Sequence, residues 1–142
     1  MKVIIHTDGG SLGNPGPSAV GVVIEAGDTK KTYAETLGVG TNNEAEYKAL
    51  ILALKKTKTI IGKKEAKKSD LVCFSDSELM VSQLNHRYQL KNERIIKLFV
   101  EIWNLALDYQ SVSFNYIPRE KNEEADGLVK SAFGRNKQGS LI

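Results

Sequence analysis

Cysteine and histidine are scarce in this sequence of 142 residues, which contains one cysteine and two histidines. The single cysteine, Cys73, excludes an intrachain disulfide and a zinc site built from several thiolates. With only His6 and His86 present, a metal site built mainly from imidazole groups is not expected. If the protein uses a metal ion, the ligands should therefore be oxygen atoms.

Long apolar stretches are also missing. No apolar run approaches the roughly 20 residues that a membrane-spanning helix needs. The N-terminal stretch MKVIIHTDGG lacks the apolar length and the cleavage site of a signal peptide, so we expect a cytoplasmic location and no membrane association. With 41% apolar and 26% charged residues, the composition is typical of a globular protein, and we predict one domain over residues 1–142. The mostly polar stretch 134–142 is expected to be a tail.

The net charge of +3 permits binding to nucleic acid but does not argue for it. The distribution of lysine is more informative, because seven lysines crowd one stretch: Lys55, Lys56, Lys58, Lys63, Lys64, Lys67 and Lys68. One interpretation is a patch that faces phosphates. The other is a solvated helix end followed by a loop, and we favour this second interpretation.

Hydrophobic periodicity and turn residues predict the element order βββαβααβα. Strands are expected at residues 3–7, 20–26, 31–39, 70–75 and 111–117. Helices are expected at about 42–59, at 77–84, from residue 92 or 93, and after Pro118, with a loop at 62–69. Hairpins join the early strands and helices separate the later ones, so the sequence predicts an α/β fold with a mixed sheet and helices on both faces.

Four acidic residues occupy the ends of these elements. Asp8 ends the first strand, Glu46 lies in the first turn of the first long helix, Asp76 follows the fourth strand, and Asp126 lies near the start of the last helix. Such positions can converge at one edge of an open sheet, where ligands bind. Carboxylates that meet there stay ionised only if cations neutralise them, and oxygen ligands favour Mg²⁺ or Mn²⁺. Two such ions can catalyse phosphoryl displacement. The pattern alone does not establish that the four carboxylates meet.

Four segments together resemble the type 1 ribonuclease H family: TDGGSLGNPG, TNNEAEYKALILAL, SDSELMVSQLN and IPREKNEEADGLVKSA. They follow the family's order and cover the chain from about Val3 to about Ala132. The resemblance implies the ribonuclease H-like fold, a mixed five-stranded sheet flanked by helices. It also implies endonucleolytic hydrolysis of the RNA strand of RNA–DNA hybrids, which leaves 5′-phosphate and 3′-hydroxyl ends.

The resemblance also implies roles for the four carboxylates. Asp8 would bridge two Mg²⁺ ions, for which Mn²⁺ is a substitute. Glu46 and Asp76 would hold the ion at the leaving group, with Glu46 also near the RNA 2′-hydroxyl. Asp126 would help to hold the ion that activates the attacking water.

Further positions match the family's substrate contacts. Amide side chains can donate and accept hydrogen bonds at base edges and 2′-hydroxyls. Asn14, Asn42 and Asn43 resemble contacts to the RNA strand. Asn42 or Asn43 could also cap the first long helix, and the two roles can coexist. Thr41 and Asn92 resemble a pocket for a phosphate of the DNA strand. The complete set of expected substrate-binding residues is Gly9, Asn14, Thr41, Asn42, Asn43, Asn92 and Arg119.

Two features depart from the family. The segment His86–Lys91 replaces a longer basic protrusion that contains tryptophan, and the loop PREKNEEAD lacks the family's active-site histidine. Arg119 is the nearest replacement for that histidine, but it cannot act as a neutral base. It could attract a phosphate or influence the nearby metal, or it could simply pair with an acidic neighbour on the surface. We expect Trp103, which falls at helical spacing with its apolar neighbours, to belong to the core.

Other functions remain open at this point. A module that binds hybrids without cutting them would be expected to have lost carboxylates, whereas all four are present. A strand-transfer enzyme or junction resolvase could share the fold, and an acidic interaction domain would show no metal-dependent activity. The shortened binding elements leave double-stranded RNA open as a second substrate. We expect a monomer, as is usual in the family.

Overall fold

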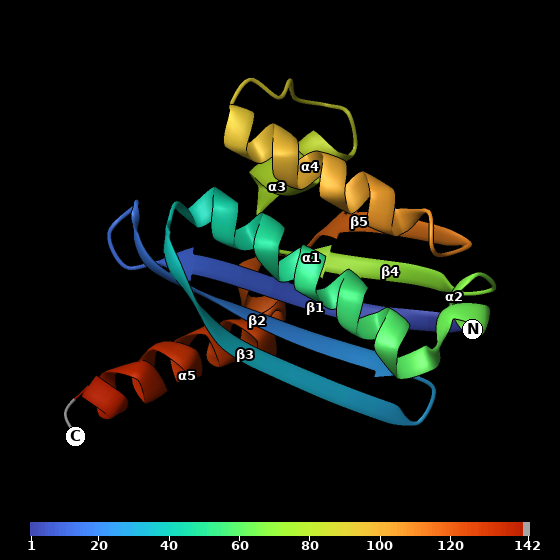
Figure 1. Cartoon of the computed structure of the whole chain (residues 1–142), viewed down its shortest axis with the longest axis horizontal. Coiled ribbons are helices and arrows are strands. Elements are labelled where there is room, and N and C mark those ends of the chain that lie inside the picture. Colours follow the sequence, from blue (N-terminus) through green and yellow to red (C-terminus); the bar gives the residue numbers. More distant parts are fainter. Residues whose placement is uncertain (141–142) are drawn as a thin grey trace.

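The structure is a computed structural model that describes residues 1–140, with side chains placed up to residue 135. Within these residues, five strands form one mixed sheet in the order β3-β2-β1-β4-β5 (Figure 1). The strands are β1 (Lys2–Ser11), β2 (Gly16–Ala26), β3 (Thr29–Gly40), β4 (Asp70–Ser75) and β5 (Ser111–Tyr116). The first three are antiparallel neighbours, whereas β4 runs parallel to both β1 and β5. The predicted five-stranded mixed sheet is confirmed.

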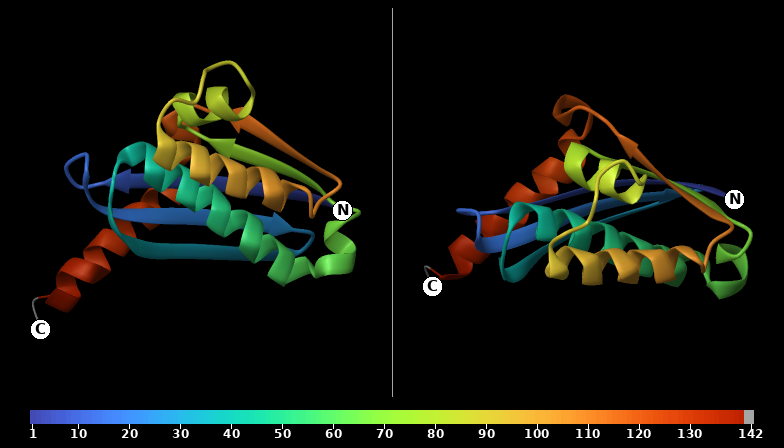
Figure 2. Two further views of the ribbon diagram at one scale, coloured as in Figure 1. Left: turned by 45° about the horizontal axis from the view of Figure 1, so that its top comes forward. Right: turned by 90° about the horizontal axis from the view of Figure 1, so that it is seen from above.

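Helices cover both faces of this sheet. α1 (Asn42–Ile61) and α4 (Glu93–Ala106) lie on one face, and α5 (Glu123–Ser140) crosses the other (Figure 2). The short helix α3 (Glu78–Leu84) follows β4. Within residues 1–140, no helix combines the length and the apolar character that crossing a membrane requires.

The start of α1 lies directly on β1. A capping box fixes this start, since the Thr41 hydroxyl accepts a hydrogen bond from the Glu44 backbone N–H and the Glu44 carboxylate accepts one from Thr41. Gly9 allows the close approach, because a Cβ atom at Gly9 would lie 2.4 Å from the Ala45 carbonyl group. Glu46 is thereby brought close to the carboxyl end of β1.

The start of α5 lies equally close to the opposite face of the sheet. A Cβ atom at Gly21, the β2 residue that pairs with Asp8, would lie 2.3 Å from the Ala125 carbonyl oxygen. The predicted apolar stripe of this helix is buried at Ala125, Val129 and Ala132. Asp126 is therefore held near Asp8 from the face opposite α1.

The main core lies between the sheet and the α1 side. Its large buried side chains come from strands and from both long helices of that side, which holds α1 firmly against the sheet. These side chains include Val3, Ile5, Ile24, Leu50, Leu54, Leu71 and Ile102.

Two predictions about local structure are wrong. The expected loop at 62–69 contains α2 (Lys63–Ala66), which is anchored by the buried Ala66. The stretch expected to be a tail stays a prediction; α5 extends into it as far as Ser140, and residues 141–142 lie outside the described residues. Trp103 is 59% exposed, because it lies on the outer side of α4 whereas Ile102 faces the core.

Candidate active site

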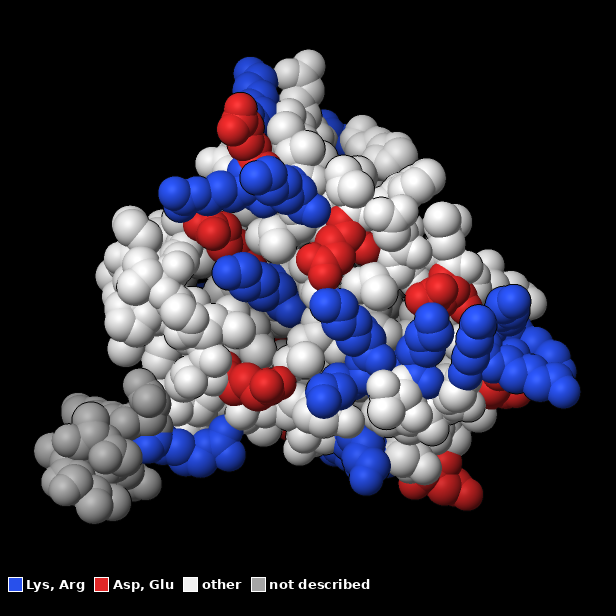
Figure 3. Space-filling model, in the orientation of Figure 1, with Lys and Arg blue, Asp and Glu red and all other residues white. Residues whose placement is uncertain are grey.

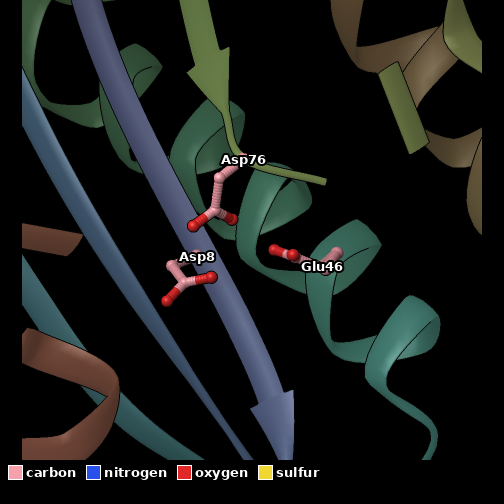
Figure 4. Close-up of side chains that lie close together, drawn as sticks. All are labelled: Asp8, Glu46 and Asp76. Atoms are coloured by element: carbon pink, nitrogen blue, oxygen red, sulfur yellow. The ribbon is translucent and has the colours of Figure 1, made fainter. Parts of the chain in front are cut away.

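Three carboxylates meet where β4 ends beside β1. β4 stops at Ser75, which pairs with Thr7, so the side of Asp8 that faces away from β2 is left open. Asp76 follows Ser75 directly, and Glu46 approaches from the start of α1. One carboxylate oxygen from each of Asp8, Glu46 and Asp76 lies within 4.8 Å of the other two (Figure 4).

Asp126 reaches the same place from α5. Its carboxyl group lies close enough to that of Asp8 to influence the pKa of Asp8, but it lies outside the cluster of three. Its Oδ2 atom also lies 2.9 Å from Nζ of Lys130, one helical turn further along α5. The structure thus brings all four predicted carboxylates together, three as a compact group and the fourth at its rim.

Burial strongly affects the ionisation of these groups. Loss of solvent and, to a smaller extent, the charges of Asp76 and Asp126 together raise the pKa of Asp8 to about 8. Burial and the charges of Asp8 and Asp76 likewise raise the pKa of Glu46 well above its usual range. Burial raises the pKa of Asp76 too, although Arg119 opposes this effect. Asp126 differs, because its hydrogen bond with Lys130 lowers its pKa.

The residues present fit a divalent metal ion. Glu46 Oε1 and Asp76 Oδ2 are buried and have no hydrogen-bond partner among the described residues. A buried polar atom without a partner is costly, and buried like charges require neutralisation. All the available ligand atoms are carboxylate oxygens, which suit hard ions such as Mg²⁺.

Comparison with known proteins identifies the family. Residues 6–132 match the family model described as Reverse transcriptase-like. A ribonuclease H from Syntrophus aciditrophicus is 30% identical, with coverage of 94% of this chain and 82% of that protein. The chain belongs to the type 1 ribonuclease H family. The crystal structure of LC11 ribonuclease H1 in complex with an RNA/DNA hybrid matches with a TM-score of 0.88 and 36% identity, covering 94% of this chain and 98% of that one.

Some relatives in this family are much longer. A bifunctional protein from Mycobacterium tuberculosis is 37% identical over 135 residues, which are 93% of this chain. The chain spans only 35% of the length of that relative. The similarity therefore concerns the ribonuclease H part of the longer protein.

Two predicted RNA contacts of the ribonuclease H family form one hydrogen-bonded network. The Asn42 Oδ1 atom accepts hydrogen bonds from the Ser11 backbone N–H at 2.8 Å and from the Ser11 hydroxyl at 3.2 Å. The Asn14 Oδ1 atom accepts one from the Asn42 backbone N–H at 2.9 Å. Both amide oxygens thus hold the β1–β2 loop against α1, and the amide N–H groups are left to serve a ligand.

The two residues of the expected DNA-phosphate pocket both cap helices. Thr41 caps α1, so the prediction that Asn42 or Asn43 caps this helix is wrong. Asn92 caps α4, where its Oδ1 atom accepts hydrogen bonds from the backbone N–H groups of Arg94 and Ile95. The Arg94 guanidinium lies 3.8 Å from the Glu44 carboxylate, which places the two helix starts side by side.

Arg119, Gly9 and Asn43 have distinct surroundings. Arg119 is exposed, and its Nε atom lies 3.9 Å from Asp76 Oδ2, so it faces the carboxylates. The Gly9 backbone N–H faces the carboxylates of Asp8 and Glu46 and lowers their pKa values. The Asn43 Oδ1 atom is buried without a partner among the described residues.

The sequence analysis did not predict two of the residues at the site. Asn122 is buried, and its side chain donates a hydrogen bond of 2.9 Å to the Thr7 carbonyl group, just before Asp8. Lys130 pairs with Asp126, as described above. The spacing of four residues between Asp126 and Lys130 on a predicted helix was the available signal for this pair.

The lysine-rich stretch 55–68 lies at the other end of α1. Figure 3 shows basic side chains gathered around the end of α1 and α2, in the right part of the view. From Glu46 to Ile61, α1 extends for about 22 Å. Lys55 pairs with Glu101 at 3.1 Å, and Lys58 pairs with Asp108 at 3.2 Å. These positions favour the interpretation of a solvated helix end.

Proposed function

We propose that this chain is an endoribonuclease that hydrolyses the RNA strand of RNA–DNA hybrids and leaves 5′-phosphate and 3′-hydroxyl ends. The observation that carries the proposal is the meeting of Asp8, Glu46 and Asp76 oxygens within 4.8 Å of one another. A module that only binds hybrids would not need this costly group of buried carboxylates. Membership of the ribonuclease H family supports the same activity.

The metal requirement follows from the carboxylates. Asp8, Glu46 and Asp76 would hold one Mg²⁺ ion, and Asp8 with Asp126 would hold a second. Such ions supply charge neutralisation at the phosphate and an activated water, and Mn²⁺ has the same preference for oxygen ligands. Around them, the Gly9 backbone N–H favours the ionised form of Asp8 and Glu46, and Asn122 fixes the backbone before Asp8.

Recognition of RNA would depend on hydrogen-bond donors. The Asn14 and Asn42 oxygens already accept hydrogen bonds from the protein, so their amide N–H groups would donate to the substrate. A 2′-hydroxyl oxygen and the acceptor atoms of base edges are suitable partners in the minor groove. The adjacent starts of α1 and α4, with Arg94, would bind a phosphate of the DNA strand, since helix N-termini attract anions.

Four further expectations belong to this proposal. The connection between α3 and α4 is short, and its exposed residues include His86, Arg87 and Tyr88, so double-stranded RNA is a second candidate substrate. The monomeric state and the cytoplasmic location stay predictions. The assignment of residues 1–142 to a single ribonuclease H domain also stays a prediction.

The direct test is cleavage of a hybrid whose RNA strand carries an end label, in Mg²⁺, Mn²⁺ or EDTA. Wild type should cut only the RNA strand and only with metal. Asp8→Asn and Asp76→Asn should each lower the rate by at least about 100-fold, since even partners outside the metal's own ligands cost up to that much. Asp28→Asn, in the exposed β2–β3 turn, is the matched control. Hybrid binding by folded wild type without any cleavage would replace the proposal with a binding function.

A further inference from the structure

The four carboxylates are neutralised unevenly. Asp8, Glu46 and Asp76 form the compact group, and the cation closest to it, Arg119, lies 3.9 Å from Asp76, beyond hydrogen-bonding distance. Asp126 instead carries its own cation, because Lys130 Nζ lies 2.9 Å from its Oδ2 atom. In the absence of metal, the group of Asp8, Glu46 and Asp76 therefore has no cation paired with it, whereas Asp126 does.

We propose that Lys130 is the resident counter-ion of Asp126 and that a second metal ion must displace it. This inference rests on the proposed function, since it concerns metal binding at the same carboxylates. It assigns an order to the two ions. The first binds at Asp8, Glu46 and Asp76 without displacing any cation, and the second binds at Asp8 and Asp126 only after Lys130 has moved.

The position of Lys130 allows this exchange. Its side chain is 76% exposed and lies on the outer surface of α5, so the ammonium group can move into solvent. The flexible stem of lysine makes such a movement inexpensive. The same Asp126 oxygen cannot bind the ammonium group and a divalent ion at once. Lys130 thus acts through Asp126 and is a positioning residue.

The test measures Mn²⁺ binding to the full chain without nucleic acid, by counting free Mn²⁺ with electron paramagnetic resonance. Lys130→Met keeps the length of the side chain and removes its charge, whereas Lys130→Arg keeps the charge. Lys30→Met is the matched control, since Lys30 pairs with Glu124 of the same helix at 3.0 Å. That variant removes one charge and one exposed ion pair without touching the four carboxylates.

We expect Lys130→Met to bind the second ion about two- to five-fold more tightly, the range given by the strength of an exposed ion pair. The first ion should bind as in wild type. Lys130→Arg and Lys30→Met should leave both affinities unchanged. The Mg²⁺ concentration that gives half-maximal cleavage should fall in Lys130→Met in the same proportion.

Three results would overturn the inference. Equal tightening in Lys130→Met and Lys30→Met would mean that only general electrostatics matters. Tighter binding of the first ion alone would place the competition elsewhere in the site. Unchanged Mn²⁺ binding with weaker binding of the hybrid would make Lys130 a substrate contact. In each case wild type would still cut hybrids with metal, so the proposed function would stand; its own failure would show as wild type that neither binds Mn²⁺ nor cuts.

Discussion

The two ends of α1 differ in how their charged side chains are arranged. At its start, Glu46 joins two other carboxylates in a buried group of like charges, and two of their oxygens have no hydrogen-bond partner among the described residues. At its end, the exposed Lys55 and the half-buried Lys58 pair with side chains of opposite charge, Glu101 and Asp108. The first arrangement costs stability unless cations enter, whereas the second is nearly neutral in energy. The contrast indicates which end binds ligands.

The largest effect is expected where α1 touches β1. In Gly9→Ala the new Cβ atom would lie 2.4 Å from the Ala45 backbone, so the start of α1 must move away and take Glu46 with it. We expect a loss of about 1–3 kcal/mol in the free energy of unfolding, as for other overpacked sites, together with a large loss of cleavage. Urea denaturation and the hybrid assay measure the two effects.

Gly10→Ala is the control for this prediction. A Cβ atom there would find its nearest neighbour, Asn42 Oδ1, at 3.9 Å, which is an ordinary contact. Near-wild-type stability and activity are expected. If the two variants behaved alike, the close contact between Gly9 and Ala45 would not control the position of Glu46.

An intermediate effect is expected from pH. The pKa of Asp8 is raised to about 8, so between about pH 4 and pH 8 the folded metal-free protein binds more protons than the unfolded chain. Its stability must therefore fall as pH rises through this range. The raised pKa of Glu46 acts in the same direction. Thermal melts in EDTA at several pH values measure this slope.

Asp8→Asn and Mg²⁺ should both weaken this dependence on pH. The substitution removes one buried charge, so at pH 8 the metal-free variant should melt at a higher temperature than metal-free wild type, although it no longer cuts. Saturating Mg²⁺ should stabilise wild type, because the ion binds the folded state. A metal-free variant less stable than wild type at pH 8 would contradict the unfavourable energy assigned to these carboxylates.

The smallest effect is expected at the far end of α1. Replacing Lys63, Lys64, Lys67 and Lys68 together with Ala should leave the Michaelis constant for a short hybrid and its dependence on salt unchanged. The reason is distance, since this end of α1 lies about 22 Å from Glu46. A higher Michaelis constant with a shallower salt dependence would show that the bound hybrid reaches these lysines.

Three of the carboxylates could be predicted because Glu46, Asp76 and Asp126 lie at or near the end of an element whose pattern is clear. The expectation that Asp8 ends the first strand is wrong, because β1 continues beside β2 as far as Ser11. Motif spacing indicated that Asp76 and Asp126 would join Asp8 and Glu46, and the structure places them there. Local patterns and the family resemblance agreed at these positions.

The other features of the fold and the site depend on contacts that sequence patterns do not reveal. α2 is a single turn in a polar stretch, and its stability comes from burying Ala66 rather than from periodicity. Three adjacent polar residues could have capped α1, and only the reciprocal bond with Glu44 selects Thr41. The link from Asn122 to the Thr7 carbonyl joins residues 115 positions apart.

The carboxylates come from three separate layers of the molecule: Glu46 from α1 on one face, Asp8 and Asp76 from the sheet, and Asp126 from α5 on the other face. None of these layers carries the full set, so no partly assembled chain could bind both ions. Recovery of cleavage during refolding would therefore report the docking of the last layer, whereas circular dichroism would already register the helices and strands of incomplete forms. Cleavage activity would therefore indicate that all three layers of the chain have folded and packed together.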